Sequence, residues 1–231
     1  MYEEIYNCPF SEALKKLADF WIQYRQYYPD YKRKFLDKAI FHKFTYFENI
    51  PDVLLEIYIY LGVLKPELNH YNKFIDFYEH FFENSYDKTI VEVGTGSLPI
   101  LSISLNKMIT FYHGNGHIIG YDPELAMEVP TIELKKEKFT HSTNISGVDL
   151  LIGFFPCEAT EIMLEKALKE EKELCLQLCG CVPEYYEDEI TSQEWLNILN
   201  RKIINNLSNA FTYELVDIGV RPEPVIALKR K

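Results

Sequence analysis

The connection between two predicted strands, near residues 211–218 and 225–229, restricts the fold more than any other feature of this sequence. Only six residues, Gly219 to Pro224, separate the two strands. Parallel neighbours need a crossover of about a dozen or more residues, whereas antiparallel neighbours can be joined by a short turn. We therefore expect these two strands to be antiparallel neighbours.

From Lys88 onward, short apolar runs rich in β-branched residues alternate with helical patterns. Such alternation is typical of a mostly parallel sheet that is covered by helices on both faces. The strands are expected at residues 89–93, 117–122, 138–142, 148–155 and 174–181, and the helices at 98–109, 124–134, 158–171 and 192–207. The sequence therefore predicts an α/β fold with a seven-stranded, mostly parallel sheet and an antiparallel terminal hairpin. The strand at 225–229 should lie between those at 174–181 and 211–218.

Residues 1–86 have a different periodicity. Apolar side chains recur there at spacings of three and four, which is typical of amphipathic helices. We expect an N-terminal helical subdomain, a cap, over residues 1–86 and a sheet domain over 87–231, with the cap packed over the carboxyl edge of the sheet. The helix at about 66–82 carries an aromatic stripe that should contact the sheet. This stripe consists of Phe74, Phe77, Tyr78, Phe81 and Phe82.

Charge and hydropathy disfavour several classes of partner. The chain has 24 basic and 35 acidic side chains and a formal net charge of −11, which disfavours nucleic acid and anionic membranes as partners. We interpret the basic, aromatic-rich stretch at 24–44 as a pair of amphipathic helices with solvated lysines. No apolar run approaches the roughly 18 residues of a membrane span, and we expect no secretory leader.

The five cysteines are an odd number, which favours reduced thiols and a cytoplasmic location. Cys175, Cys179 and Cys181 are expected to be small residues in a buried strand, because a Cys-Gly-Cys spacing is not a typical metal motif. Cys157 follows a predicted strand, but no basic partner that would activate it as a nucleophile is identifiable. The sequence therefore predicts no metal site.

A glycine turn joins the strand at 89–93 to the following helix. Gly94 allows a sharp turn and Gly96 allows close approach of a ligand to the backbone. The helix that follows offers free N–H groups to negative charge. Asp122 ends the neighbouring strand, where a carboxylate can accept both hydroxyls of a ribose. Turn and acid together indicate a nucleotide-like ligand.

At these residues the sequence resembles the class I S-adenosylmethionine-dependent methyltransferases, a family with a Rossmann-like fold. Val91-Glu92-Val93-Gly94-Thr95-Gly96 is similar to the first motif of that family. The resemblance covers about residues 86–231 and implies S-adenosylmethionine as the cofactor. It implies that Asp122 binds the ribose, that Asn144 and Ile145 flank the adenine, and that the strand at 148–155 ends near the reacting methyl group. The cofactor-binding residues implied are Glu92, Gly94, Thr95, Gly96, Asp122, Asn144, Ile145 and Phe154.

The sequence also departs from the family pattern. Leu98 replaces a third glycine, and Phe154-Phe155-Pro156-Cys157 differs from the Asn/Asp-Pro-Pro-aromatic signature of enzymes that methylate nucleic-acid bases or glutamine. The resemblance therefore implies methyl transfer to a small-molecule substrate, with no catalytic residue identified. A non-catalytic cofactor-binding scaffold or sensor is the main alternative. An NAD-dependent oxidoreductase fits less well, because its fingerprint keeps the third glycine and its sheet lacks the antiparallel hairpin.

Four further residues have a competing interpretation. Glu158 and Glu161 are expected to stabilise the N-terminus of a helix, although Glu158 could act as a general base. His113 and His117 are interpreted as loop residues rather than metal ligands, because two glycines lie between them.

Overall fold

The computed structural model describes residues 19, 22, 69–82, 85–96, 99–125, 129, 131–186, 190–220 and 222–231. Most of the expected cap, including the basic-aromatic stretch at 24–44, lies outside the described residues, as does Leu98. The helices are α5 (Asn69–Phe81), α6 (Ile100–Phe111), α7 (Thr160–Lys169) and α8 (Ser192–Asn206), with short 3-10 turns η2 (Ser85–Asp87) and η3 (Cys157–Ala159). The strands are β1 (Thr89–Val93), β2 (His117–Tyr121), β3 (Glu133–Lys135), β4 (Leu150–Phe154), β5 (Glu173–Gln177), β6 (Phe211–Val216) and β7 (Val225–Arg230).

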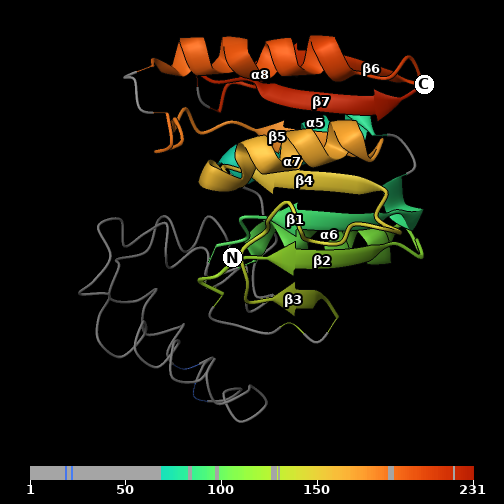
Figure 1. Ribbon diagram of the computed structural model, residues 1–231. Helices are drawn as coiled ribbons and strands as arrows, with labels where there is room; N and C mark the ends of the chain where they lie inside the picture. Colours follow the sequence, from blue (N-terminus) through green and yellow to red (C-terminus); the bar gives the residue numbers. More distant parts are fainter. Residues whose placement is uncertain are drawn as a thin grey trace.

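The seven strands form one sheet in the order β3-β2-β1-β4-β5-β7-β6 (Figure 1). β1 to β5 pair in parallel, whereas β7 is antiparallel to both β5 and β6. The predicted Rossmann-like α/β fold with an antiparallel terminal hairpin is therefore confirmed. The position of β7 between β5 and β6 is the one that the short connection at 219–224 predicts.

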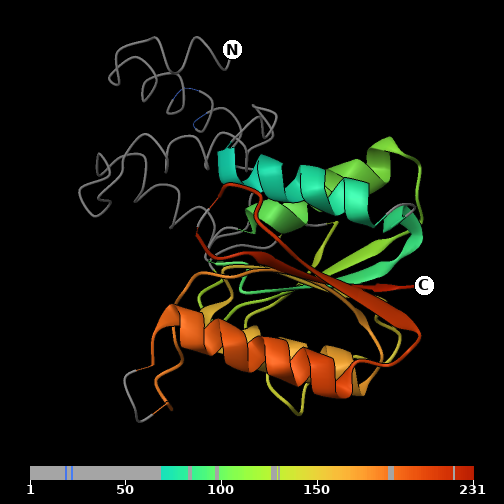
Figure 2. The same ribbon diagram turned by 90° about the horizontal axis from the view of Figure 1, so that it is seen from above.

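Helices cover both faces of the sheet. Figure 2 shows α5 and α6 on one face and α7 and α8 on the other. Three members of the aromatic stripe on α5 are almost completely buried, namely Phe74, Tyr78 and Phe82, and the ring centroids of Phe74 and Phe154 of β4 are 5.2 Å apart. The predicted contact between this stripe and the sheet is thus confirmed. α5 packs on the sheet although it precedes the expected boundary at residue 86.

The core lies on both sides of the central strands. All five residues of β4 and of β5 are buried, as expected for strands covered on two faces. On the α7–α8 side, Trp195, Leu199 and Ile203 of α8 pack against this core. α8 begins at a capping box, in which Thr191 and Glu194 each accept from the other's backbone N–H. Among the described residues, no helix combines the length and the apolar character needed to cross a lipid bilayer.

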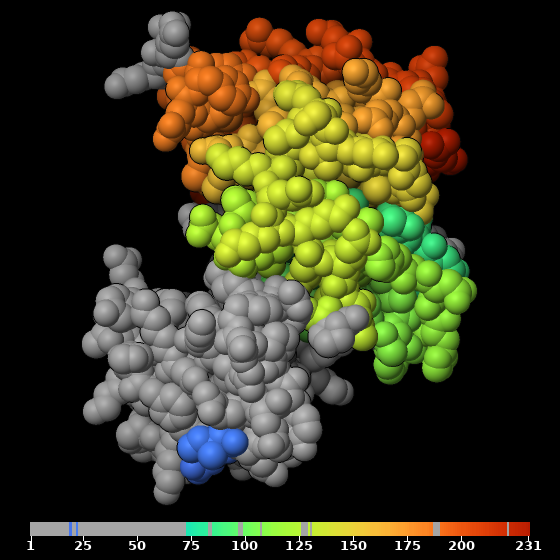
Figure 3. All heavy atoms as spheres, turned by 60° about the horizontal axis from the view of Figure 1, so that its bottom comes forward, coloured from blue at the N-terminus to red at the C-terminus, as the bar shows by residue number. Residues whose placement is uncertain are grey.

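The prediction for the third strand is wrong. The structure has no strand at 138–142; β3 lies earlier, overlaps the end of the stretch at 124–134 that was expected to be helical, and pairs with β2. The hydroxyl of Thr143 accepts a hydrogen bond from the backbone N–H of Thr140 at 2.9 Å, and such local bonds compete with strand pairing. The segment between β3 and β4 instead runs across the surface, in yellow-green in Figure 3.

Candidate functional site

The turn after β1 is fastened to the end of β2. We call residues 94–96 the glycine turn. The N–H of Gly94 donates to the carbonyl of Tyr121 at 2.9 Å, and the N–H of Gly96 donates to Asp122 Oδ2 at 2.8 Å. The structure therefore brings together the two features that the sequence analysis singled out. They meet at the carboxyl edge of the sheet, where open α/β sheets bind their ligands.

The two glycines of this turn have different reasons to be glycine. Both have left-handed backbones, with φ of +77° at Gly94 and +70° at Gly96, which favours glycine at each position. A Cβ atom on Gly94 would lie 2.8 Å from Pro156 Cα, whereas a Cβ on Gly96 would meet no described atom within 4 Å. Gly94 thus permits packing within the protein, and Gly96 leaves space at the turn that no described residue fills.

The carboxylate of Asp122 is half-buried and already accepts two backbone hydrogen bonds. Oδ2 accepts from Gly96, and Oδ1 accepts from the N–H of Glu124 at 2.7 Å. A carboxylate has about four lone-pair sites, so each oxygen retains one for a further donor. These bonds fix the orientation of the carboxylate while leaving it able to accept from a pair of hydroxyls.

Glu92 lies beneath the turn and is buried, with 2% of its surface exposed. Its Oε2 accepts a short hydrogen bond from the Ser102 hydroxyl of α6. Burial raises the pKa of Glu92 to about 7, and the nearby charge of Asp122 adds to the increase. A carboxyl group with such a pKa changes its charge near neutral pH, which is common at functional sites.

Thr95 and Phe154 also lie at this edge. Thr95 is buried, and its hydroxyl donates to the carbonyl of Gly96 at 3.3 Å. Phe154 ends β4 and is 8% exposed, between Phe74 of α5 and Phe155, whose ring centroid lies 4.2 Å away. Thr95 therefore supports the turn, and Phe154 contributes an apolar wall under α5.

Asn144 and Ile145 are not brought to this edge by a strand. Their expected place depended on a strand at 138–142, which the structure lacks. Asn144 is exposed, and its Oδ1 accepts from the N–H of Ser146 at 2.9 Å. Ile145 is 1% exposed and belongs to the core, and its carbonyl accepts from Val148, which precedes β4. The two residues thus lie on the segment that leads to the amino end of β4.

Strained backbone follows β4. Phe155 and Cys157 have φ of +59° and +45°, which is uncommon for residues other than glycine. The N–H of Phe155 donates to the carbonyl of Gln177 in β5 at 3.1 Å, so the neighbouring strand holds this conformation. Strained residues cluster at functional sites, and no pattern in the sequence marks these two positions.

The expectation for the cysteines is correct only for Cys175, which is buried in β5. Cys179 and Cys181 lie beyond the end of β5, and their sulfur atoms lie close to that of Cys157. None of the three forms a disulfide with another described residue. The hydrogen bond between the side chains of Cys157 and Cys179 lowers the pKa of Cys179 to about 5, whereas the pKa of Cys157 is raised. The sequence held one signal for this cluster, because Cys157 follows the strand predicted at 148–155.

The other candidate groups have structural partners. Glu161 accepts from Lys202, Tyr185 and Tyr186. Burial raises the pKa of Glu161, but these bonds and the charge of Lys202 outweigh burial and hold it below its ordinary value. The exposed Glu158 lies 3.5 Å from Lys138. Neither arrangement supplies a poised general base.

The two histidines are in a loop and at a strand start. His113 has a φ of +56° in the turn after α6. His117 begins β2, and its Nε2 lies 3.3 Å from a carboxylate oxygen of Glu133. Neither belongs to a cluster of metal-binding groups among the described residues.

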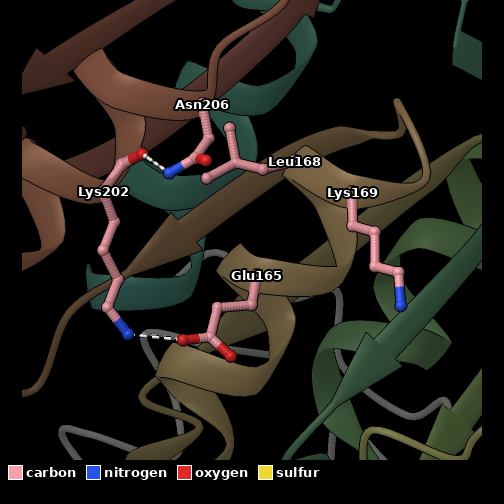
Figure 4. A pocket seen from close by; sticks show the side chains of 5 residues that line it. All are labelled: Glu165, Leu168, Lys169, Lys202 and Asn206. Atoms are coloured by element: carbon pink, nitrogen blue, oxygen red, sulfur yellow. Dashed lines mark hydrogen bonds and ion pairs between the residues drawn. The ribbon is translucent and has the colours of Figure 1, made fainter.

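A surface pocket of about 460 Å³ lies elsewhere, between α7 and α8. Figure 4 shows its five lining residues, which are Glu165, Leu168, Lys169, Lys202 and Asn206. An ion pair between Lys202 and Glu165 crosses it. Helices between the strands of such a sheet run back toward the amino edge, so the later turns of α7 and α8 lie away from the glycine turn. The pocket is therefore separate from the candidate site.

Comparisons with known proteins find structural likeness at low sequence identity. No protein-family model and no curated protein matches the chain. The plantazolicin methyltransferase in complex with S-adenosylhomocysteine is 14% identical, with a TM-score of 0.46 over 95% of this chain and 100% of the other. Human N-acetylserotonin methyltransferase in complex with S-adenosylmethionine is 14% identical, with a TM-score of 0.44 over 95% of this chain and 67% of the other.

Proposed function

We propose that the glycine turn and Asp122 bind S-adenosylmethionine, and that the protein transfers its methyl group to a small-molecule acceptor. The observation that supports this most directly is the 2.8 Å hydrogen bond from Gly96 N–H to Asp122 Oδ2. It holds a turn with open space beside an acid with spare lone pairs, at the carboxyl edge of the sheet. This combination suits a ligand that has an amino-acid part and a ribose.

The residues at the site fit the parts of this cofactor. The free lone pairs of Asp122 can accept from the two ribose hydroxyls, and the open space at Gly96 accommodates the ligand near the backbone. The carboxyl group of Glu92, below the turn, can ionise. Its negative charge would then attract the cationic amino group of the cofactor. When bound, the cofactor supplies an electrophilic methyl group at its sulfonium, and the protein acts mainly by positioning the acceptor.

The sheet order favours this cofactor over a dinucleotide. The usual dinucleotide-binding order is 3-2-1-4-5-6 without an antiparallel strand inserted, whereas β7 lies here between β5 and β6 and runs antiparallel. A non-catalytic scaffold remains the second candidate, because positioning chemistry leaves no diagnostic base at the site. The two candidates differ only in whether bound cofactor is consumed.

A small acceptor is favoured by charge and by the loop after β4. The net charge of −11 opposes a polyanionic substrate at long range. The Phe154-Phe155-Pro156-Cys157 segment offers apolar and thiol groups at the edge, not the polar side chains that would hold a base or an amide. Reduced thiols in this segment fit a cytoplasmic location.

The binding part of the proposal is tested by calorimetric titration with S-adenosylmethionine, S-adenosylhomocysteine and NAD. Asp122→Ala should weaken binding of the first two by roughly ten- to a hundredfold, because losing hydrogen bonds to a charged group costs about 1.5–3 kcal/mol. Gly96→Ala should also weaken binding, since its methyl group would occupy the open space. Tight binding of NAD, or of none of the three, would contradict the proposal.

Gly147→Ala is the matched control for Gly96→Ala. Gly147 also has a left-handed backbone, with φ of +80°, and a Cβ there would meet no described atom within 4 Å. It lies before the amino end of β4, so it carries the same backbone strain without proximity to the turn. Equal loss of cofactor binding in both variants would attribute the effect of Gly96→Ala to strain alone.

Catalysis is tested with methyl-labelled S-adenosylmethionine and a deproteinised extract of small metabolites. Label should pass to the low-mass fraction with the wild-type chain and not with Asp122→Ala. Cofactor binding without any transfer would support the scaffold. Label that appears only in added protein or nucleic acid would exclude the small-molecule acceptor.

A further inference from the structure

Three thiol groups that are distant in the sequence meet at the carboxyl edge of β4 and β5. Cys157 lies in η3, just after β4, and Cys179 and Cys181 lie just after β5. The Sγ atoms of Cys157 and Cys179 are 3.7 Å apart, and all three sulfur atoms lie within 4.8 Å of one another. Cys157 and Cys181 are exposed and Cys179 is half-buried, so the cluster is open to solvent.

The backbone on both sides of the cluster is shaped to bring the sulfur atoms together. Cys157 has a left-handed φ of +45°, which turns the chain immediately after β4. On the other side, Gly180 has a φ of +74°, and a Cβ there would lie 2.3 Å from Glu223 Oε1. The left-handed backbone favours glycine between Cys179 and Cys181, and a larger residue would also have to displace the Glu223 side chain.

The spacing of the sulfur atoms matches a soft metal ion. Two thiolates on one tetrahedral Zn²⁺, each at about 2.3 Å, lie roughly 3.8 Å apart. The pair Cys157–Cys179 is already at 3.7 Å. The sulfur atoms of the other two pairs lie within 4.8 Å of each other. A side-chain rotation that shifts Cys181 Sγ by about an ångström would therefore place all three sulfur atoms at the spacing of zinc ligands. Thiolate ligands select soft or borderline ions over Mg²⁺ and Ca²⁺.

We propose that Cys157, Cys179 and Cys181 bind one Zn²⁺ ion per chain through three thiolates, with the fourth position open. No histidine or carboxylate joins the three among the residues that the structure describes. Three protein ligands with an open fourth position are typical of zinc sites that bind a substrate or water. Each ligand that is still a protonated thiol releases its proton to the solvent as the zinc–sulfur bond forms, and no electron is transferred.

The site is independent of the proposed cofactor, although the two are neighbours. Pro156 precedes Cys157 and packs against Gly94, where a Cβ would approach within 2.8 Å. A bound ion would therefore be held by the residue that follows Pro156, the residue that packs against the glycine turn. A thiol or other soft group of an acceptor held at this edge of the sheet could coordinate its open position.

The test uses the full chain, prepared without oxygen and freed of metal by a chelator. Titration with Zn²⁺ should give one ion per chain, and Co²⁺ in its place should give intense thiolate-to-metal charge-transfer absorption. Cys157→Ser, Cys179→Ser and Cys181→Ser should each weaken Zn²⁺ binding by at least about tenfold, the loss that removal of even an outer partner of a ligand commonly causes. Cys175→Ala is the control, because Cys175 lies in β5 outside the cluster, and it should leave the affinity unchanged.

A second measurement on the wild-type chain avoids variants that fail to fold. Bound Zn²⁺ should protect Cys157, Cys179 and Cys181 from alkylation, as read by peptide mass mapping. Two results would overturn the proposal. One is absence of charge-transfer absorption and of protection in the reduced chain. The other is a chain that forms a Cys157–Cys179 disulfide with an added oxidant and binds no Zn²⁺ after reduction.

Discussion

The buried carboxyl group of Glu92 makes the stability of this protein depend on pH in a way that one substitution removes. Glu92→Gln keeps the size of the side chain and an oxygen that can accept from the Ser102 hydroxyl, but it cannot ionise. In the wild-type chain, ionisation places a negative charge in a buried position close to Asp122, which is why the pKa is raised to about 7. Glutamine avoids that cost at every pH.

The sign and size of the effect follow from proton linkage. Between the unfolded pKa near 4.5 and the folded pKa near 7, the folded chain binds a proton that the unfolded chain has released, so the free energy of unfolding falls as pH rises. This stabilising contribution is complete below the unfolded pKa and lost above the folded one. Each pKa unit is worth about 1.4 kcal/mol, so the total is roughly 3 kcal/mol. About 2.5 kcal/mol of it falls between about pH 5 and pH 8.

The assay is urea denaturation of both chains across this pH range. The free energy of unfolding of Glu92→Gln minus that of the wild type should increase by about 2–3 kcal/mol from about pH 5 to pH 8. Subtracting the wild type cancels the titration of the other carboxyl groups. Glu214→Gln on the exposed side of β6 controls for the loss of one acidic side chain. A difference that does not change with pH would refute the reasoning that burial raises this pKa.

Three further substitutions test the packing. Gly94→Ala should lower the free energy of unfolding by about 1–3 kcal/mol more than Gly96→Ala, because only the former meets Pro156; equal losses in denaturant titrations would contradict this. Phe74→Ala should cost about 3–5 kcal/mol, since Phe74 is fully buried, whereas a small loss would place α5 in a separate unit. Thr191→Ala, which removes the cap of α8, should cost about 1 kcal/mol, and an unchanged melting temperature would count against the capping box.

The parts of the fold that followed from the sequence are those with a local cause. The short connection at 219–224 permits only an antiparallel pair, and the buried apolar runs of β1 and β4 are long enough to be recognised. The third strand failed because β3 has only three residues at the edge of the sheet. The Thr140–Thr143 bond is a side-chain interaction that hydrophobic periodicity does not report.

The residues of the candidate site that could be predicted from the sequence also have a local cause, and the others do not. The glycine turn and Asp122 were found because each follows a strand directly, so the topology alone brings them together. The strand expected before Asn144 is absent, so the part of Asn144 in the site stays a prediction. The cysteine cluster was missed because Cys157 and Cys179 are 22 residues apart, and their meeting depends on β4 and β5 being neighbours and on the left-handed backbone at Cys157.

The place of β7 has a consequence for how the chain folds. β6 has no neighbour other than β7 in this sheet, so it cannot join the sheet before β7 has formed. The β6–β7 ladder pairs segments close in sequence, whereas β1 to β5 pair across long crossovers, which are slow to close. We therefore expect this hairpin to form early and to dock onto β5 as a unit. Until it docks, β5 has an exposed apolar edge, and unpaired edges of this kind promote association between partly folded chains.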